Sequence, residues 1–141
     1  MIWNNRMLLA ALIAWASAQL IKTLITFVKT KKFVLERLVG SGGMPSSHTS
    51  LVTALVISVG RYAGFQSAAF AVAVCFALVT MYDATGVRHA AGEQAKILNY
   101  MMDNWKNAPE MFEKDLKELL GHTPVEVIGG AVLGISVGLL V

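Results

Sequence analysis

Four apolar stretches alternate with polar segments along the chain, at residues 7–28, 45–59, 66–82 and 124–141. As an α-helix, the first would be about 33 Å long, which is enough to cross the hydrocarbon core of a bilayer. The other three are slightly shorter than the roughly 20 residues of a typical span. The pattern predicts an all-α integral membrane bundle with about four transmembrane helices, forming a single domain over residues 1–141.

The composition favours lipid over water as the surroundings of this bundle. Hydrophobic residues make up 55% of the chain and charged residues 15%, whereas a soluble domain has about 25% charged residues. The net charge of +3 is dispersed and is not interleaved with aromatic side chains, which argues against nucleic-acid binding. The lone cysteine, Cys75, cannot form an internal disulfide and is interpreted as a packing residue. Core helices of a soluble protein are the alternative interpretation.

The long polar segment, residues 83–123, contains two apolar runs at helical spacing, separated by Pro109. These runs are Ile97, Leu98, Met101, Met102 and Trp105, followed by Met111, Phe112, Leu116, Leu119 and Leu120. They predict two short amphipathic helices, which either lie on the membrane surface or pack on the bundle.

Small residues recur at helical spacing in the last two apolar stretches. They are Ala69, Ala71, Ala73, Ala77, Gly129, Gly130, Gly134 and Gly138. Small residues let membrane helices approach closely. This spacing therefore fits either tight packing within one bundle or the interface of a homodimer.

Alternating spans bring three polar segments to the same membrane face: residues 40–48, 83–89 and 121–126. Most of the unusual polar residues of the chain belong to these segments. Their convergence is the main argument from the residues for a functional site.

The first segment ends in a proline, two serines and a histidine at the start of a predicted helix. Free backbone N–H groups at such a start, that of Gly43 among them, attract anions. Ser46 and Ser47 add hydroxyl groups, and His48 would project beside a bound phosphate. The alternative is an ordinary capped helix start with a histidine at the interface.

The other two segments supply a cation and a second histidine. Arg88 offers a rigid fork that matches phosphate oxygens, and Asp83 would orient it; a surface ion pair is the alternative. His122 and Glu126 share a helix face, so the carboxylate would fix the tautomer and leave the other ring nitrogen free to attack. An acid this close to an apolar span is costly unless it has a partner, although a purely structural pair remains the alternative.

Two polar residues, Gln19 and Lys22, lie one turn apart late in the first apolar stretch. The lysine would either extend to the lipid headgroups or turn inward and bind phosphate, with Gln19 in support.

Several motifs resemble the divergent branch of the type 2 phosphatidic acid phosphatases, a family related to vanadium haloperoxidases and acid phosphatases. The chain contains GGMPSSH from Gly42, YDATGVR from Tyr82, GEQA from Gly92 and LGHTPVEV ending at Val127. The PSSH and HTPVE sequences resemble the PSGH and H-x3-D motifs of the wider family. Together they span nearly the whole chain.

The resemblance implies a role for each matching residue. His122 would be the nucleophile that forms a phosphohistidine, Glu126 would orient it, and His48 would protonate the leaving oxygen. Ser46, Ser47 and backbone amides would hold the phosphoryl oxygens. The wider motifs have a lysine and an arginine that are absent at the matching positions here, and Lys22 and Arg88 are the candidates to replace them.

The function that these features favour is a lipid-phosphate phosphatase that needs no metal or other cofactor, acting on a polyprenyl phosphate, phosphatidate or a similar lipid in the cell membrane. A non-catalytic membrane protein that binds lipid headgroups or scaffolds a partner is the alternative. A metal site built from His48, Asp83 and His122 lacks typical ligand spacing. Because positive charges collect on the face that carries the site, that face is predicted to be cytoplasmic.

Overall fold

The computed structural model describes residues 4–31, 43–103 and 121–141. This described part of the chain is helical and contains no strand. Its helices are α1 (Arg6–Thr30), α2 (Ser47–Ala63), α3 (Ala68–Thr85), α4 (Val87–Asp103) and α5 (Pro124–Leu140). The all-α fold predicted from the apolar pattern is therefore confirmed.

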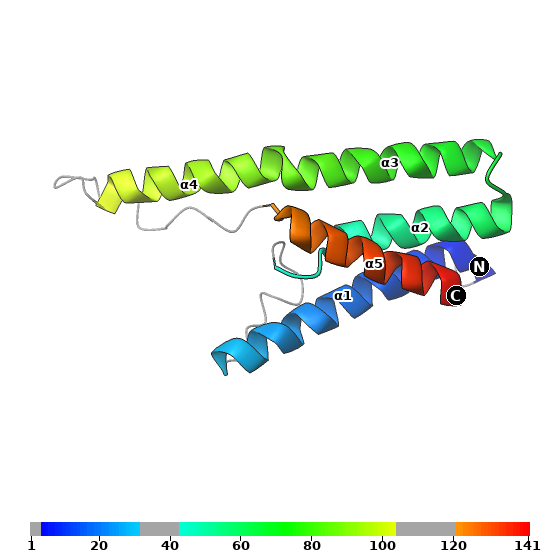
Figure 1. Ribbon diagram of the computed structural model, residues 1–141, viewed down its shortest axis with the longest axis horizontal. Coiled ribbons are helices and arrows are strands. Elements are labelled where there is room, and N and C mark those ends of the chain that lie inside the picture. Colours follow the sequence, from blue (N-terminus) through cyan, green and yellow to red (C-terminus); the bar gives the residue numbers. More distant parts are fainter. Residues whose placement is uncertain (1–3, 32–42, 104–120) are drawn as a thin grey trace.

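Helix α2 lies at the centre of the bundle and packs against α1, α3 and α5. Successive helices α1, α2, α3 and α5 run in alternating directions, and both chain termini lie at the same end (Figure 1). The opposite end gathers the start of α2, the end of α3 and the start of α5. We call this the site end.

Capping side chains define where four of the helices begin. The side chains of Asn5, Ser46, Ser67 and Thr123 each accept a hydrogen bond from a backbone N–H three residues later. Such caps satisfy N–H groups that have no partner within the helix. Ser46, which caps α2, is one of the residues predicted to bind phosphate.

Small residues let α5 approach α2 closely. A Cβ atom added at Gly130 would lie 2.5 Å from the carbonyl oxygen of Ser46, and one at Gly134 would lie 2.5 Å from that of Ser50. The Ser50 hydroxyl also donates a 3.0 Å hydrogen bond to the carbonyl oxygen of Gly130. These glycines therefore serve packing within the bundle, which is one of the two roles expected from their spacing.

The distribution of side chains is the reverse of that in a soluble protein. The largest fully buried side chains are polar: Lys22, Thr49, Ser46, Ser47, Ser50 and Ser58. Large apolar side chains instead point outward, among them Leu20, Leu24, Val28, Val72, Val79 and Val132. Buried polar groups and extensive exposed apolar surface are the informative departures from a soluble fold, and they fit a bundle surrounded by lipid.

Two of the described helices, α1 and α3 with its continuation α4, are long and apolar enough to cross a membrane. Helix α5 is apolar but shorter, at 17 residues, and α2 also has 17 residues.

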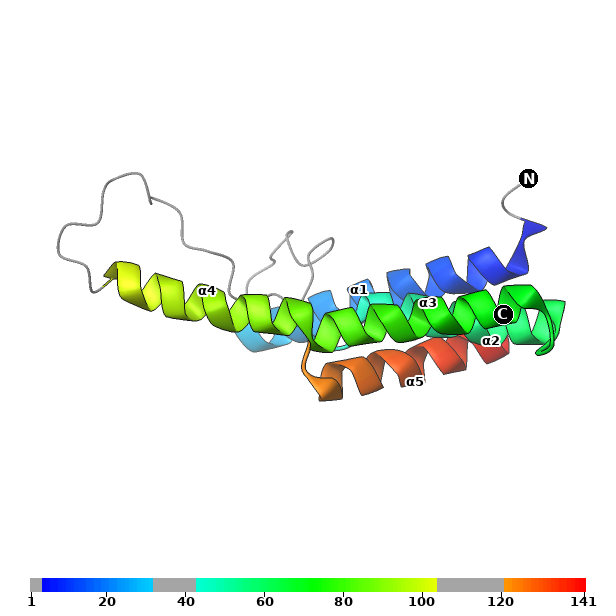
Figure 2. The ribbon, with the colours of Figure 1, turned by 90° about the horizontal axis from the view of Figure 1, so that it is seen from above.

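Helix α4 contains the first of the two amphipathic runs expected in the polar segment. It begins directly after Gly86 and continues the direction of α3 beyond the bundle (Figures 1 and 2). Among the described helices, α4 packs against α3 only. The second expected helix, together with Trp105, lies outside the described residues.

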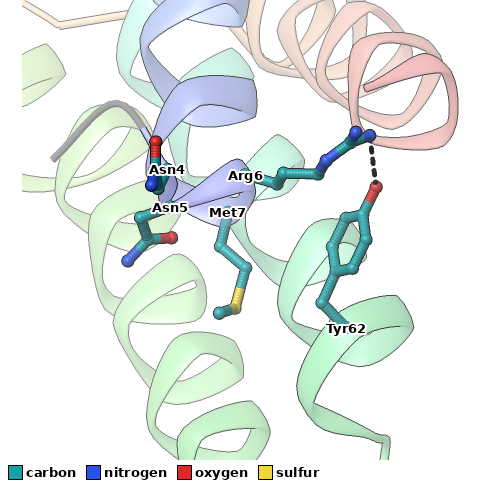
Figure 3. A pocket seen from close by; sticks show the side chains of 5 residues that line it. All are labelled: Asn4, Asn5, Arg6, Met7 and Tyr62. Carbon is teal, nitrogen blue, oxygen red and sulfur yellow. Dashed lines mark hydrogen bonds between the residues drawn. The ribbon is translucent and has the colours of Figure 1, made fainter. Parts of the chain in front are cut away.

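The end of the bundle opposite the site is tied together by basic and aromatic side chains. The Arg61 guanidinium donates to the carbonyl oxygens of Gly138 and Leu139 at 2.7 and 2.9 Å. Arg6 donates to the Tyr62 hydroxyl at 3.4 Å beside a cavity of about 450 Å³ (Figure 3). A cation at the C-terminal carbonyls of a helix is favourable, so this cluster fixes the end of α5 to α2.

Candidate active site

Backbone hydrogen bonds join the three polar segments at the site end. The Ser46 N–H donates to the carbonyl oxygen of Glu126 at 3.0 Å, which joins the first segment to the third. The His122 N–H donates to the carbonyl oxygen of Ala84 at 2.9 Å, which joins the third to the end of α3. The convergence expected from alternating helices is therefore present in the fold.

Gly121 allows the third segment to lie directly against the start of α4. Its φ angle is +84°, a conformation that side chains other than glycine rarely adopt. A Cβ atom here would lie within 2.3 Å of the His89 backbone nitrogen. Only glycine fits, and the close contact sets the position of the next residue, His122.

A small cavity of about 30 Å³ lies where the segments meet. It is lined by His48, Thr80, Asp83, Ala84, Arg88, Gly121 and His122. This volume is close to the volume that one water molecule occupies in the liquid. A phosphoryl group would enter only if the exposed side chains at the rim, His48 and Arg88, moved outward.

His122 is held by Glu126 at the start of α5. Its Nδ1 atom lies 3.3 Å from Glu126 Oε2, and that oxygen also accepts a 2.9 Å hydrogen bond from the Thr123 N–H. The capping box of α5 thus fixes the carboxylate beside the imidazole. A carboxylate at Nδ1 favours a proton there and leaves the lone pair on Nε2.

The other ring nitrogen of His122 is available for chemistry. The residue is 3% exposed, and Nε2 has no hydrogen-bond partner among the described residues. Burial lowers the pKa of His122 below 6.5, and this effect exceeds the opposing influence of Glu126, which raises it. The neutral imidazole, which is the nucleophilic form, is therefore favoured near neutral pH.

His48, the second residue of α2, is exposed and lines the same cavity as His122. It lies within electrostatic range of Lys22, Asp83 and Arg88. Asp83 and Arg88 form an ion pair across the cavity rim, with 2.6 Å between Nε and Oδ2. Both charged side chains are about half exposed, so this pair alone contributes little to stability.

Lys22 turns inward and is not directed to the headgroups. It is 1% exposed, and its charge acts on both His48 and His122. Gln19, one turn earlier, is also buried, and its Oε1 atom has no hydrogen-bond partner among the described residues. The inward alternative for Lys22 is therefore the one that the fold adopts.

Ser46 and Ser47, the two serines of the PSSH segment, do not line the cavity, and neither does Gly43. The Ser46 hydroxyl caps α2 and accepts a 3.0 Å hydrogen bond from the Thr49 hydroxyl. The Ser47 hydroxyl is buried without a hydrogen-bond partner among the described residues. Gly43 has a φ angle of +84° before the start of α2. Phosphate binding by these three residues stays a prediction.

Sequence reasoning missed Thr80, which also lines the cavity. It precedes Asp83 by three residues and Ala84 by four on α3. Residues at this spacing share a helix face, and this was the available signal. Its hydroxyl donates to the carbonyl oxygen of Phe76 at 2.8 Å.

The described residues contain no group of three or more His, Cys, Asp or Glu side chains that could hold a metal ion. Two cations, Arg88 and Lys22, act on the histidine pair alongside the carboxylates of Asp83 and Glu126. The Arg88 guanidinium is the cation that lines the cavity, and a guanidinium can bind an anion.

Comparison with known proteins finds relatives over almost the whole chain. Residues 3–137 match the profile of the Divergent PAP2 family. A Bacillus subtilis (strain 168) protein described as the uncharacterized membrane protein YuiD is 43% identical, over 97% of this chain and 94% of its own length. No solved structure matches the chain.

Proposed function

Because this chain belongs to the divergent PAP2 family, we propose that it is a membrane-embedded phosphatase that acts on lipid phosphates through His122. The main observation behind this proposal is that His48 and His122 line the same cavity and that Glu126 lies beside Nδ1 of the buried His122. A nucleophile, its orienting group and a second acid–base group are the parts that covalent phosphoryl transfer needs.

In the first step, Nε2 of His122 attacks the phosphorus atom and a P–N bond forms. The bond between phosphorus and the lipid oxygen breaks, and His48 in its protonated form gives a proton to the departing oxygen. The products are the lipid alcohol and a phosphohistidine. Glu126 stabilises the positive charge that develops on the imidazole.

In the second step, water attacks the phosphohistidine. His48, now neutral, accepts a proton from the water as the new P–O bond forms and the P–N bond breaks. Inorganic phosphate leaves, and His122 regains its free Nε2. His48 thereby returns to its protonated form.

Cations near the two histidines would stabilise the charge on the phosphoryl oxygens. Arg88 lines the cavity, and the buried Lys22 acts on both histidines from α1. Phosphoryl transfer depends mainly on such positioning and charge stabilisation. Movement of Arg88 away from Asp83 would free its guanidinium for the substrate and open the cavity.

The substrate class follows from the surroundings of the site. Large apolar side chains cover the outside of the bundle, and the relative from Bacillus subtilis is a membrane protein. A site at the end of such a bundle suits a phosphate whose apolar part stays in lipid, such as a polyprenyl phosphate or phosphatidate. The chain would cross the bilayer several times.

The closed Asp83–Arg88 pair and the small cavity also fit a second function, the binding of a lipid headgroup without turnover. Phosphate release from lipid phosphates by the purified protein in detergent separates the two. We expect release by the wild type and none by His122→Ala, with the variant still folded by circular dichroism. Release by His122→Ala at the wild-type rate would contradict the mechanism, and no release by either protein would favour headgroup binding.

A further inference from the structure

An apolar groove of about 400 Å³ runs along the seam between α2 and α3. Its walls include Leu55 and Val59 of α2 and Ala69, Val72, Ala73 and Phe76 of α3. It shares no lining residue with the cavity of the candidate site.

On each of the two helices, the groove lies on the same face as the cavity of the candidate site. On α2, Leu55 follows His48 by seven residues, so the two share a helix face. On α3, Phe76 precedes Thr80 by four residues and again shares its face. At a rise of 1.5 Å per residue, the groove begins about 6–10 Å from the cavity and extends to about 18 Å from it, at Ala68.

We propose that this groove holds the single apolar chain of a phosphate monoester, such as an alkyl or prenyl phosphate, whose headgroup occupies the site. This inference rests on the proposed function. The polar cavity, with Arg88 and two histidines in its lining, and the apolar groove together complement an amphiphile with a phosphate at one end. The groove volume lies near the lower end of the range for small-molecule sites, about 300–1,000 Å³, which favours one chain over the two of a diacyl lipid.

The groove faces the surrounding lipid, so a tail that enters it gains no transfer out of water. What it gains is close packing, which holds the headgroup at the correct distance from His122. Filling the groove should therefore reduce turnover of long substrates and leave short ones unaffected.

A second depression on α3 provides a matched control. It has a volume of about 430 Å³ and adjoins the groove, with which it shares Val72 and Phe76. Cys75 lines this depression and not the groove, and none of the lining residues of the depression comes from α2. A bulky residue at Cys75 therefore alters the lipid-facing surface of the same helix without filling the groove.

The test compares Ala69→Phe with Cys75→Phe on dodecyl phosphate and butyl phosphate. Ala69 lies about 16 Å along α3 from Thr80, which is close to the end of an extended dodecyl phosphate and far beyond the end of butyl phosphate. We expect Ala69→Phe to lower kcat/KM for dodecyl phosphate about tenfold, with butyl phosphate unchanged and Cys75→Phe without effect on either. Equal effects of both variants, or no effect of Ala69→Phe, would overturn the groove assignment.

A binding experiment keeps the inference separate from the proposed catalysis. Dodecyl phosphate carrying a diazirine at its chain end is photolysed with wild-type protein and with His122→Ala. Adducts should form at the α2–α3 groove in both proteins, and unlabelled dodecyl phosphate should suppress them while dodecanol does not. Adducts that favour the Cys75 depression, or that resist the competitor, would refute the groove whether or not the protein turns over substrate.

The assignment of one chain is tested with a diacyl competitor. Dioleoyl phosphatidate should suppress the adducts less well than dodecyl phosphate at equal surface concentration. Equal suppression would show that the groove does not select for a single chain.

Discussion

Replacing Glu126 with glutamine tests whether the carboxylate acts on His122 beyond capping α5. In the wild type, the Thr123 N–H donates to Glu126 Oε2 at 2.9 Å. Glutamine has the same length as glutamate and keeps an oxygen that can accept this hydrogen bond. The helix start should therefore form as before. What changes is the charge next to His122 Nδ1, 3.3 Å away.

The expected loss follows from the strength of that contact. A hydrogen bond to a charged group contributes about 1.5–3 kcal/mol and a neutral one about 0.5–1.5 kcal/mol. Their difference of about 1–2 kcal/mol corresponds to a fall in kcat of about 5- to 30-fold. Glu126→Asp should cost more, because the carboxylate moves back by about 1.5 Å and loses contact with Nδ1.

The assay is kcat and the pH profile of phosphate release, measured with thermal unfolding in the same detergent. Glu126 raises the pKa of His122 against burial, which lowers it. Without the carboxylate the pKa falls further, so the neutral nucleophile persists to lower pH. For Glu126→Gln we therefore expect the acidic inflection of the pH profile of phosphate release to move to lower pH, while the unfolding temperature stays near the wild-type value.

Two results would refute this account of Glu126. One is wild-type kcat in Glu126→Gln, which would mean that the charge does not assist the nucleophile. The other is an acidic inflection that moves to higher pH, because removal of a nearby negative charge cannot favour the protonated imidazole.

In the wild type, the lowered pKa of His122 should place the acidic inflection of kcat/KM that reports this residue below pH 6.5; an inflection above that value would contradict the assignment. Gly134→Ala should reduce the free energy of unfolding by about 1–3 kcal/mol, because its Cβ would meet the backbone of α2. Gly129→Ala should cost less, because its Cβ would meet a flexible methionine end; chemical denaturation in detergent compares the two. The site is predicted to face the cytoplasm, so Lys96→Cys in a Cys75→Ala background should not react with a membrane-impermeant thiol reagent in intact cells. Labelling at position 96 would show that the site faces the outside.

Much of the fold was predictable because apolar runs and capping signals are local properties of the chain. The four-residue spacing of His122 and Glu126 predicted that they share a helix face, and they are in contact in the fold. The capping box at Thr123 is the local signal that marks the start of α5. The continuity of α3 and α4 was not predicted, because Asp83, Gly86 and Arg88 indicated the end of a helix. The backbone bonds of Gly86 to Tyr82 and of Ala90 to Gly86 nevertheless carry the helical pattern across.

The candidate site was predictable in outline but not in detail. Whether Lys22 points inward depends on the neighbouring α2, which local sequence does not encode. The hydroxyl of Ser46 can either cap a helix or bind an anion with the same oxygen, and the sequence does not decide between these roles. In the fold it accepts hydrogen bonds from Thr49, three residues later. Thr80 shares a helix face with Asp83, but its place in the cavity also depends on how α3 packs against the third polar segment, which the sequence does not show.

The contact of Gly121 with the start of α4 fixes where His122 lies in the candidate site. His122 takes its position from Ala84 and from the backbone beside His89, which lie across space from it. Both contacts are made by residues outside the 17-residue connection between Asp103 and Gly121. Insertions and deletions in that connection should be tolerated among relatives, whereas any side chain at position 121 would shift the imidazole directly.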